Sequence, residues 1–285
     1  MKARYRYRIY PKQSQIVPLA KAFGSARVVW NDALWLYKNA LKNNLELPSN
    51  ISGKVTTEAK KTEERHWLAE VSSVILQQSV NDLKVAWKNY FDSKKGIRKG
   101  KEVGKPKFKK KSSRQAIRFT KNAFSVHSQS VKLAKIGHIK MVVSRPLPNS
   151  PSSVTIIKDC AGRYFASFVV EVSQPIPPQT DSSVGIDLGL THFAILSSGE
   201  KIENPRLHKK MLKRIKKANR RRLLALKDSN RRKRRKLRLA KLHAKVKDRR
   251  IDFLHKLTTR LVRENQTLAV EDLNVSGSAI RLVET

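Results

Sequence analysis

Two acidic residues, Asp187 and Glu271, each close a short apolar run in a strongly basic chain. The runs read "SVGID" (183–187) and "TLAVE" (267–271). If they form parallel neighbouring strands, both carboxylates emerge at the same edge of one sheet. Carboxylate oxygens suit Mg²⁺, and a pair of such ions stabilises the attacking and leaving oxygens of a phosphodiester. A second interpretation stays open, in which both acids simply end strands at the solvent.

The segments around these acids supply the elements that must position them. Residues 184–187 and 192–196 are typical of two strands joined by a tight turn, and "SSGE" (197–200) predicts a second turn before a short strand at "KIEN". Leucines recur through the basic stretch 206–250, which predicts helices interrupted near 228–230. Phe253, Leu257 and Leu261 continue a helical face. These helices would form part of a right-handed crossover between the two acid-bearing strands.

The run "GIDLGLT" (185–191) also resembles the first phosphate loop of actin-like ATPases and sugar kinases. Those folds need further glycine-rich loops to hold a nucleotide. Beyond this stretch and its "SSGE" turn, only Gly277 lies downstream, and the chain has no Gly-Gly pair. The glycine pattern therefore disfavours an ATPase.

Charge is the strongest compositional signal. The 285 residues include 62 Lys or Arg and 22 Asp or Glu, which gives a net charge of +40. Such a surface repels itself unless a polyanion neutralises it. Nucleic acid is the expected partner, with salt-sensitive binding; a solubility feature or an anionic membrane surface are the alternatives.

Several classes are disfavoured by what the sequence lacks. No apolar run approaches the ~20 residues that span a bilayer, and no apolar segment follows the basic N-terminus as in a signal peptide. The single Cys160 rules out an intrachain disulfide and a multi-Cys zinc site. Four scattered histidines fit structural or surface roles better than a metal site: His127, His192, His243 and His255. We expect a reducing, cytoplasmic setting.

The first half of the chain predicts a strand, a helical unit and a strand-rich block. Apolar residues alternate with Arg4, Arg6 and Arg8, which predicts a half-buried strand over 3–9 with an arginine face. Helical spacing recurs over 30–41 and over 76–91, on a helix that begins near Ser72 or Ser73. We interpret its aromatic stripe as core rather than as a base-stacking platform.

A basic loop follows from 94 to 114, and five β-like runs then favour a small barrel or sandwich that includes the 3–9 strand. The runs are "AIRFT", "FSVHSQSVKL", "HIKMVVS", "SVTIIK" and "RYFASFVVEV", with a hairpin turn predicted at "DCAG" (159–162). The proline-rich stretch 173–183 predicts a linker and a domain boundary.

Several motifs, in order along almost the whole chain, resemble the TnpB (OrfB) family encoded by bacterial and archaeal insertion sequences. They are "YRIYPKQSQ", "FGSARVVWNDAL", "GKPKFKKK", "GIDLGLTHFAILSSGE", the basic helices, "DFLHKLTTRLVRE" and "LAVEDLNVSG". This family is similar to type V CRISPR effectors. The resemblance implies a guide RNA, recognition of a short duplex motif beside the target, and DNA cleavage by a RuvC-like nuclease.

The implied fold is α+β and multidomain. Residues 1–11 and 104–172 would form a wedge-type β-barrel, with 12–103 as an inserted helical recognition lobe and its basic linker. After the linker at 173–183, residues 184–285 would form a partial RuvC-like, ribonuclease-H-fold α/β domain. The resemblance makes Asp187 and Glu271 catalytic and Mg²⁺-binding, and makes Gln77 and Thr120 contacts to the target-adjacent DNA motif.

Basic residues on three segments are expected to hold RNA or DNA backbone, which sets affinity and register rather than sequence preference. They are Arg4, Arg6 and Arg8 on the N-terminal strand, Lys107, Lys109 and Lys110 in the basic loop, and Arg220, Arg221, Arg231, Arg232, Arg234 and Arg235 on the basic helices. The expected partners are DNA, a guide RNA and, functionally, the insertion sequence's own transposase. We expect a nucleoid-associated, prokaryotic protein without membrane attachment.

One departure from the family divides the functional hypotheses. The family carries a zinc-binding pair of Cys-x-x-Cys motifs and a third catalytic Asp after the second carboxylate, and this sequence shows neither. Near the end, Asp272 and Glu284 lie in no matching motif. The first hypothesis is an Mg²⁺-dependent, RNA-guided DNA nuclease. The second is a catalytically inactive nucleic-acid-binding relative or regulator, and a ribosome-associated RNA-binding protein is the third.

Overall fold

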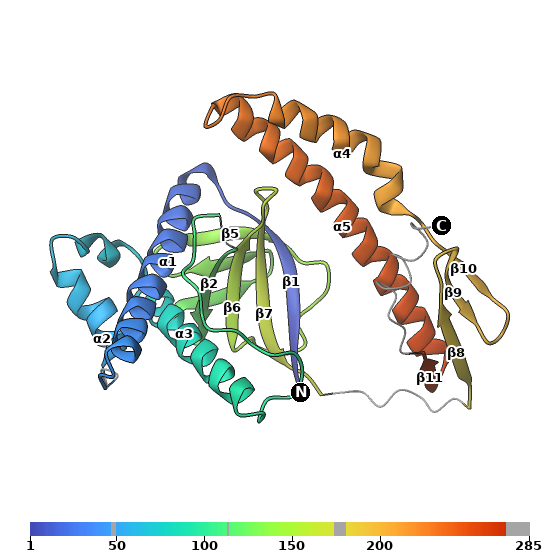
Figure 1. Ribbon diagram of the computed structural model, residues 1–285, viewed down its shortest axis with the longest axis horizontal. Helices are drawn as coiled ribbons and strands as arrows, with labels where there is room; N and C mark the ends of the chain where they lie inside the picture. Colours follow the sequence, from blue (N-terminus) through green and yellow to red (C-terminus); the bar gives the residue numbers. More distant parts are fainter. Residues whose placement is uncertain (47–49, 113, 174–180, 272–285) are drawn as a thin grey trace. The chain divides into compact units, whose positions relative to one another are not determined.

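The computed structural model describes residues 1–46, 50–112, 114–173 and 181–271. The chain divides into two compact units, Met1–Gln174 and Pro175–Thr285. The boundary falls inside the stretch expected to be a proline-rich linker, of which residues 174–180 lie outside the described residues. Figure 1 draws both units, coloured along the sequence.

The first unit is built on one seven-stranded, antiparallel sheet with the order β2-β6-β7-β1-β5-β4-β3. Its strands are β1 (Lys2–Tyr10), β2 (Gln115–Thr120), β3 (Phe124–His127), β4 (Ser130–Leu133), β5 (Gly137–Val142), β6 (Ser153–Lys158) and β7 (Tyr164–Glu171). The predicted 3–9 strand is therefore central, paired with β7 along nearly its whole length and with β5 at its end. The predicted turn at 159–162 joins β6 to β7, with Gly162 at φ +77°.

This sheet curls (Figure 1). The strands at its two edges, β2 and β3, are separated in sequence only by the short turn Lys121–Ala123. Four Cα steps from Thr120 to Phe124 span at most about 15 Å, whereas seven flat strands would extend about 29 Å from edge to edge. The short connection therefore requires the two edges to approach each other, which confirms the barrel-like curvature expected from the strand pattern.

Alternation along the strands fills the inside of the curl. Tyr7 and Ile9 of β1 and Phe168 of β7 are at most 2% exposed, while Arg4 and Arg6 are exposed. The rings of Tyr7 and Phe168 lie 5.8 Å apart. The period-two pattern of the N-terminal strand thus separates an apolar inner face from an arginine-bearing outer face, as predicted.

Two long helices complete the first unit, α1 (Gln13–Lys42) and α3 (Ser73–Lys94). Between them lie α2 (Ile51–Gly53) and the short helical turns η1 (Lys54–Glu58), η2 (Ala59–Lys61) and η3 (His66–Glu70). Trp30 of α1 and Trp87 of α3 are buried, and Trp87 stacks on Tyr37 at 5.9 Å and on Phe91 at 5.6 Å. The aromatic stripe therefore belongs to the helical core.

The second unit joins a four-stranded sheet to a long helical hairpin. Its elements are β8 (Ser183–Leu188), β9 (His192–Leu196), β10 (Lys201–Glu203), α4 (Leu207–Leu223), α5 (Asn230–Glu264) and β11 (Thr267–Val270). The sheet order is β10-β9-β8-β11, with β11 parallel to β8 and the other pairs antiparallel. The predicted parallel pairing of the two acid-bearing strands is thus confirmed.

The helical hairpin α4–α5 lies between β10 and β11 in sequence and packs through its leucine-rich face. Met211, Ile215 and Val246 form its small core. Leu257 and Leu261 of α5 instead pack on the sheet against Val184 and Leu196. An ion pair of 2.8 Å between Arg260 and Glu200 holds α5 beside the β9–β10 turn. No helix among the described residues has the length and apolar character to cross a membrane.

Candidate functional site

Asp187 and Glu271 occupy matching positions on two adjacent parallel strands. The β8–β11 register pairs Val184 with Leu268 and Ile186 with Val270, an offset of 270 − 186 = 84 residues. The same offset places Glu271, the residue after β11, beside Asp187. Neighbouring strands lie about 4.8 Å apart, so the two residues stand within one strand spacing of each other. The sheet topology therefore brings these two acids together.

Both acids belong to the sheet face that α5 does not cover. Val184, Ile186 and Leu188 pack in the core formed with Leu257 and Leu261. Because side chains alternate along a strand, the residue at 187 points to the opposite face. Asp187 and Glu271 are accordingly exposed. Within the described residues, no hydrogen bond or ion pair engages either carboxylate, which leaves their oxygens available to a cation or a ligand.

The hairpin after Asp187 is held by a hydroxyl. The backbone N–H of Gly185 donates to Ser197 Oγ at 3.0 Å, and the Ser197 N–H donates to the Gly185 carbonyl at 2.9 Å. At Gly189, an added Cβ would lie 3.3 Å from the His192 carbonyl oxygen. Gly189 thus permits the close turn that directs the chain from β8 into β9. The "GIDLGLT" run (185–191) therefore forms a tight hairpin beside Asp187.

The donor set suits a hard divalent cation in part. Two carboxylates at one edge supply oxygen ligands of the kind Mg²⁺ prefers, with water completing its octahedral shell. Among the described residues no group of three or more His, Cys, Asp or Glu could hold a metal ion. Asp272 and Glu284, the remaining acids near the chain end, lie outside the described residues. The residues that the structure describes therefore fit an ion held by two protein ligands.

Gln77 and Thr120 lie on neighbouring elements of the first unit. Gln77 is exposed near the start of α3, and Thr120 is the half-exposed last residue of β2. The two elements are joined by an ion pair between Asp82 of α3 and Arg118 of β2. Both residues are thus presented by packed, regular elements.

The arginine face of β1 is covered in part by aromatic side chains. The guanidinium of Arg6 lies 3.8 Å from the ring centre of Phe165, and that of Arg8 lies 5.0 Å from the same ring. Arg8 and Phe165 are register partners on β1 and β7. Sequence reasoning missed Phe165, although the alternation in "RYFASFVVEV" already places it opposite the buried Tyr164 and Ala166. The outer sheet face therefore combines cations with a half-exposed ring.

The basic loop is fastened to α1, and its three predicted lysines differ. Asn31 accepts from the backbone N–H of Lys109 at 2.8 Å and donates to its carbonyl at 3.1 Å. Trp30 Nε1 donates to the Lys107 carbonyl at 3.2 Å. The Lys109 ammonium lies 3.5 Å from the Trp30 ring centre. Lys107 and Lys110 are exposed, whereas Lys109 is half-buried.

Burial changes the protonation of Lys109. Desolvation lowers the pKa of its ammonium to about 8, and the charge of Asp82 opposes that shift. The face of the Trp30 ring also favours the cation. Lys109 therefore acts mainly on the fold of the loop, while its neighbours Lys107 and Lys110 present charge to the solvent.

The predicted arginines of the helical hairpin also fall into two groups. Arg232 Nη1 donates to the Ala225 carbonyl at 2.9 Å, and Arg235 donates to the Arg221 carbonyl. These carbonyls lie at the C-terminal end of α4 and just beyond it, where cations and donors are favourable. Arg231 and Arg234 are exposed. Arg220 and Arg221 are exposed as well.

Comparisons with known proteins give the family. A profile of the OrfB family, described as "Probable transposase", matches residues 167–281, and one described as "Helix-turn-helix domain" matches residues 1–46. Within 1–46 the structure has β1 and the single helix α1 rather than two helices. The first match lies mostly in the second unit, and the second match covers β1 and α1 of the first unit.

Two curated relatives match along nearly the whole chain. A protein of Streptomyces pristinaespiralis named "Putative RNA-guided DNA endonuclease" is 40% identical over 280 residues, covering 96% of this chain and 68% of that protein. The Escherichia coli protein "Putative RNA-guided DNA endonuclease InsQ" is 29% identical to this chain, and the match covers 96% of this chain and 66% of that protein. This chain thus spans about two thirds of the curated relatives it matches.

A solved Cas12f1–sgRNA–target DNA complex also matches, with a TM-score of 0.31 and 14% identity over 96% of this chain and 73% of that one. Because this structural similarity is low, the family assignment rests on the sequence relatives. The identity to the Streptomyces protein, over almost the entire chain, places this chain in the TnpB (OrfB) family of insertion-sequence proteins.

Proposed function

We propose that this protein is a TnpB-type, RNA-guided and metal-dependent DNA endonuclease whose reaction is centred on Asp187 and Glu271. One observation carries the proposal: the parallel register of β8 and β11 sets these two acids side by side on the sheet face opposite α5. The relatives that match this chain are named as RNA-guided DNA endonucleases. In this proposal the second unit is the RuvC-like nuclease of ribonuclease-H fold.

The roles of the two carboxylates follow from their placement. Asp187, anchored on a paired strand, and Glu271, one strand spacing away, would hold a divalent ion, with Mg²⁺ expected. Such an ion supplies charge stabilisation to the attacking and leaving oxygens of a phosphodiester. Because both acids are exposed within the described part of the chain, on the sheet face opposite α5, a nucleic-acid strand could approach them from that face.

The first unit is assigned to guide and target binding. Its curled sheet would act as the wedge-type barrel over 1–11 and 104–172, and residues 12–103 as the recognition lobe. Gln77 and Thr120 are proposed to contact the DNA beside the target. Exposed cations of both units, among them Arg4, Lys107 and Lys110, would neutralise phosphates without reading sequence.

A second candidate function is binding of RNA and DNA without cleavage. It is supported by the donor set, because among the described residues the two acids are joined by no third acid, Cys or His. Two ligands hold an ion less firmly than three, and they position the attacking water less well. The two functions share every nucleic-acid contact, so only the chemical step separates them.

The test is cleavage by the purified protein with its co-purifying RNA. That RNA is sequenced to define the guide, and matching DNA is incubated with and without Mg²⁺. The proposal expects cutting that needs Mg²⁺ and disappears in Asp187→Ala, while RNA retention is unchanged. Asp252→Ala, at an exposed position on α5, is the matched control and should cut like the parent. Retained cutting by Asp187→Ala would refute the proposed site, and RNA-dependent DNA binding without cutting would establish the second function.

A further inference from the structure

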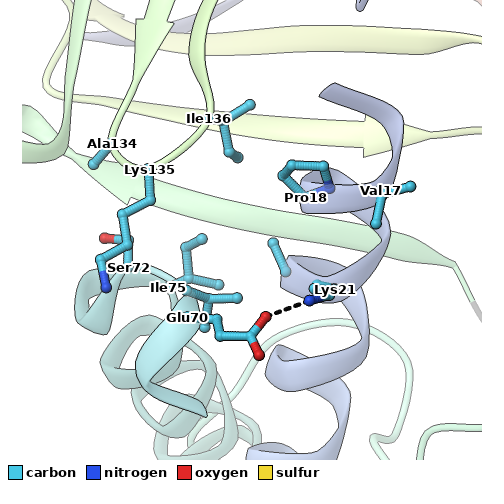
Figure 2. Close-up of a pocket in the computed structure, with 11 residues that line it drawn as sticks. Val17, Pro18, Lys21, Glu70, Ser72, Ile75, Ala134, Lys135 and Ile136 are labelled. Carbon is cyan, nitrogen blue, oxygen red and sulfur yellow. Dashed lines mark hydrogen bonds and ion pairs between the residues drawn. The ribbon is translucent and has the colours of Figure 1, made fainter. Parts of the chain in front are cut away.

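The first unit contains a cavity of about 160 Å³ that the proposed chemistry does not use. It lies between the start of α1, the turn η3 with the start of α3, and the β4–β5 turn (Figure 2). Val17, Pro18 and Ala22 of α1 form one wall, and Ile75 of α3 forms part of the floor. The lining is mostly apolar, and the polar groups Lys21, Glu70, Ser72 and Lys135 complete it.

Polar contacts between the three walls keep this cavity open. Lys21 of α1 forms an ion pair with Glu70 of η3, drawn as a dashed line in Figure 2. Lys135 of the β4–β5 turn donates from Nζ to the Ala69 carbonyl. Gln15 of α1 donates to the His138 carbonyl at 2.8 Å. Each pair of walls is thus joined directly, so the space is pre-formed rather than created by a ligand.

One polar side chain on the cavity wall makes no hydrogen bond to the rest of the described structure. Ser72 is only 7% exposed and is the N-cap residue of α3, yet its side chain accepts no hydrogen bond from the helix. No hydrogen bond within the described residues engages its hydroxyl. The hydroxyl is therefore open to a hydrogen-bonding group that enters the cavity. Of the first-turn N–H groups of α3 beside it, that of Ile75 donates to the Ser72 carbonyl at 3.1 Å.

Cations gather on the same side of the first unit. Lys21 and Lys135 line the cavity, and Lys60 of η2 is close enough to Lys135 for their charges to interact. Burial, and then the charge of Lys135, lower the pKa of Lys60. An anionic group at this position would relieve that repulsion between ammonium groups.

The cavity volume limits what can enter. An engineered protein cavity of about 150 Å³ accepts one benzene molecule, so this space has room for one ring. A nucleobase presents an apolar face to aliphatic walls and hydrogen-bonding atoms at its edge. Its attached phosphate would lie near the lysines. We propose that this cavity receives a single unstacked nucleobase of the bound nucleic acid, with its edge at Ser72 and its phosphate beside Lys21 and Lys135.

This inference rests on the proposed function only in requiring nucleic-acid binding, and it does not depend on cleavage. Asp187 and Glu271 belong to the other unit, so a variant of the cavity leaves the proposed metal ligands unchanged. A protein without cleavage can still hold a base here. Conversely, a protein that cuts DNA need not bind a base in this cavity. Each proposal, base binding and DNA cleavage, can therefore be refuted without the other.

The test is photochemical cross-linking of the full-length protein to single-stranded RNA of mixed sequence containing 4-thiouridine. Cross-links mapped by mass spectrometry are expected within residues 17–22 and 70–75. Ala134→Leu fills the cavity from the turn and should reduce these cross-links about tenfold, as should Ala22→Leu from α1. Ala86→Leu, a partly buried position on α3 outside the cavity, is the matched control and should cross-link like the parent.

Binding of an abasic DNA strand of the same length separates base from phosphate contacts, and both filled variants should bind it within twofold of the parent. Unchanged cross-links in a folded Ala134→Leu or Ala22→Leu protein would overturn the proposal. So would cross-links that map only outside the two cavity segments. Thermal unfolding of the unsubstituted protein is also measured with N-acetylphenylalaninamide and with each nucleoside monophosphate. If only N-acetylphenylalaninamide raises the unfolding temperature, the occupant is an aromatic protein side chain and the proposal is wrong.

Discussion

Two pairs of arginines on α5 carry equal charge but are expected to respond oppositely to substitution. Arg232 and Arg235 donate to carbonyls at the end of α4, whereas Arg231 and Arg234 are exposed. One double variant combines Arg232→Gln and Arg235→Gln. The other combines Arg231→Gln and Arg234→Gln, and the two double variants are compared. Each removes two positive charges from the same two turns of helix, so the pairs are matched in charge and in propensity.

The structure sets the magnitude. A hydrogen bond from a charged donor contributes about 1.5 kcal/mol when partly buried and less when exposed. Arg232 and Arg235 are both half-buried, and the hydrogen bond of Arg235 is the more exposed one. This gives a loss of about 1–2 kcal/mol in the free energy of unfolding for the first double variant. The second double variant should lose less than about 0.5 kcal/mol, since no hydrogen bond or ion pair among the described residues engages its guanidinium groups.

Nucleic-acid binding should show the reverse order. If Arg231 and Arg234 each neutralise one phosphate, the slope of log K against log salt falls by about 1.4 on a single strand. Arg232 and Arg235 have donors engaged within the hairpin, so their loss should change the slope less. Urea unfolding and binding titrations at several salt concentrations measure both quantities. Equal destabilisation by the two variants, or an equal change in slope, would refute the division of this cluster into capping and binding arginines.

Three further predictions concern the first unit. Phe168→Ala, in the sheet core, should lower the free energy of unfolding by about 3–5 kcal/mol in urea, and a loss below 1 kcal/mol would contradict the buried ring contacts. Because the pKa of Lys109 is lowered to about 8, the unfolded chain binds more protons above that pH. The free energy of unfolding should therefore rise between pH 8 and about 10.4, the pKa of this lysine in the unfolded chain. Lys109→Met should flatten that rise, and a pH profile of stability that Lys109→Met leaves unchanged would contradict the lowered pKa. Asn31→Ala should release the basic loop and speed trypsin cleavage after Lys107 and Lys110 severalfold, whereas Asn39→Ala on the same helix should not.

The elements that carry the candidate site follow closely from local patterns. "SVGID" and "TLAVE" are short apolar runs that each end in an acid, and the long helical segment between them is the kind of connection that parallel neighbours need. The break of the basic stretch into two helices follows from the Ser229 N-cap, whose side chain accepts from the Arg232 N–H at 3.1 Å. Such signals are local, so the sequence can show them.

The remaining features depend on contacts between distant segments. The run "FSVHSQSVKL" was expected as one strand, but it forms the hairpin β3–β4 with its turn at Ser128 and Gln129. That turn lacks the Asn-Gly or Asp-Gly pair typical of two-residue hairpins. The inward position of Lys109 depends on Trp30, and the capping roles of Arg232 and Arg235 depend on where α4 ends. A charge pattern alone gives no sign of either arrangement.

The central claim is that Asp187 and Glu271 share one divalent ion, and Mn²⁺ binding measured by electron paramagnetic resonance tests it most directly. The comparison uses the parent, Asp187→Ala, Glu271→Ala, the double variant, and Glu203→Ala as a control on β10 of the same sheet. The account predicts that either single substitution removes most of the bound Mn²⁺, that the double variant loses little more, and that Glu203→Ala binds like the parent. Equal Mn²⁺ binding by the parent and the double variant would contradict it.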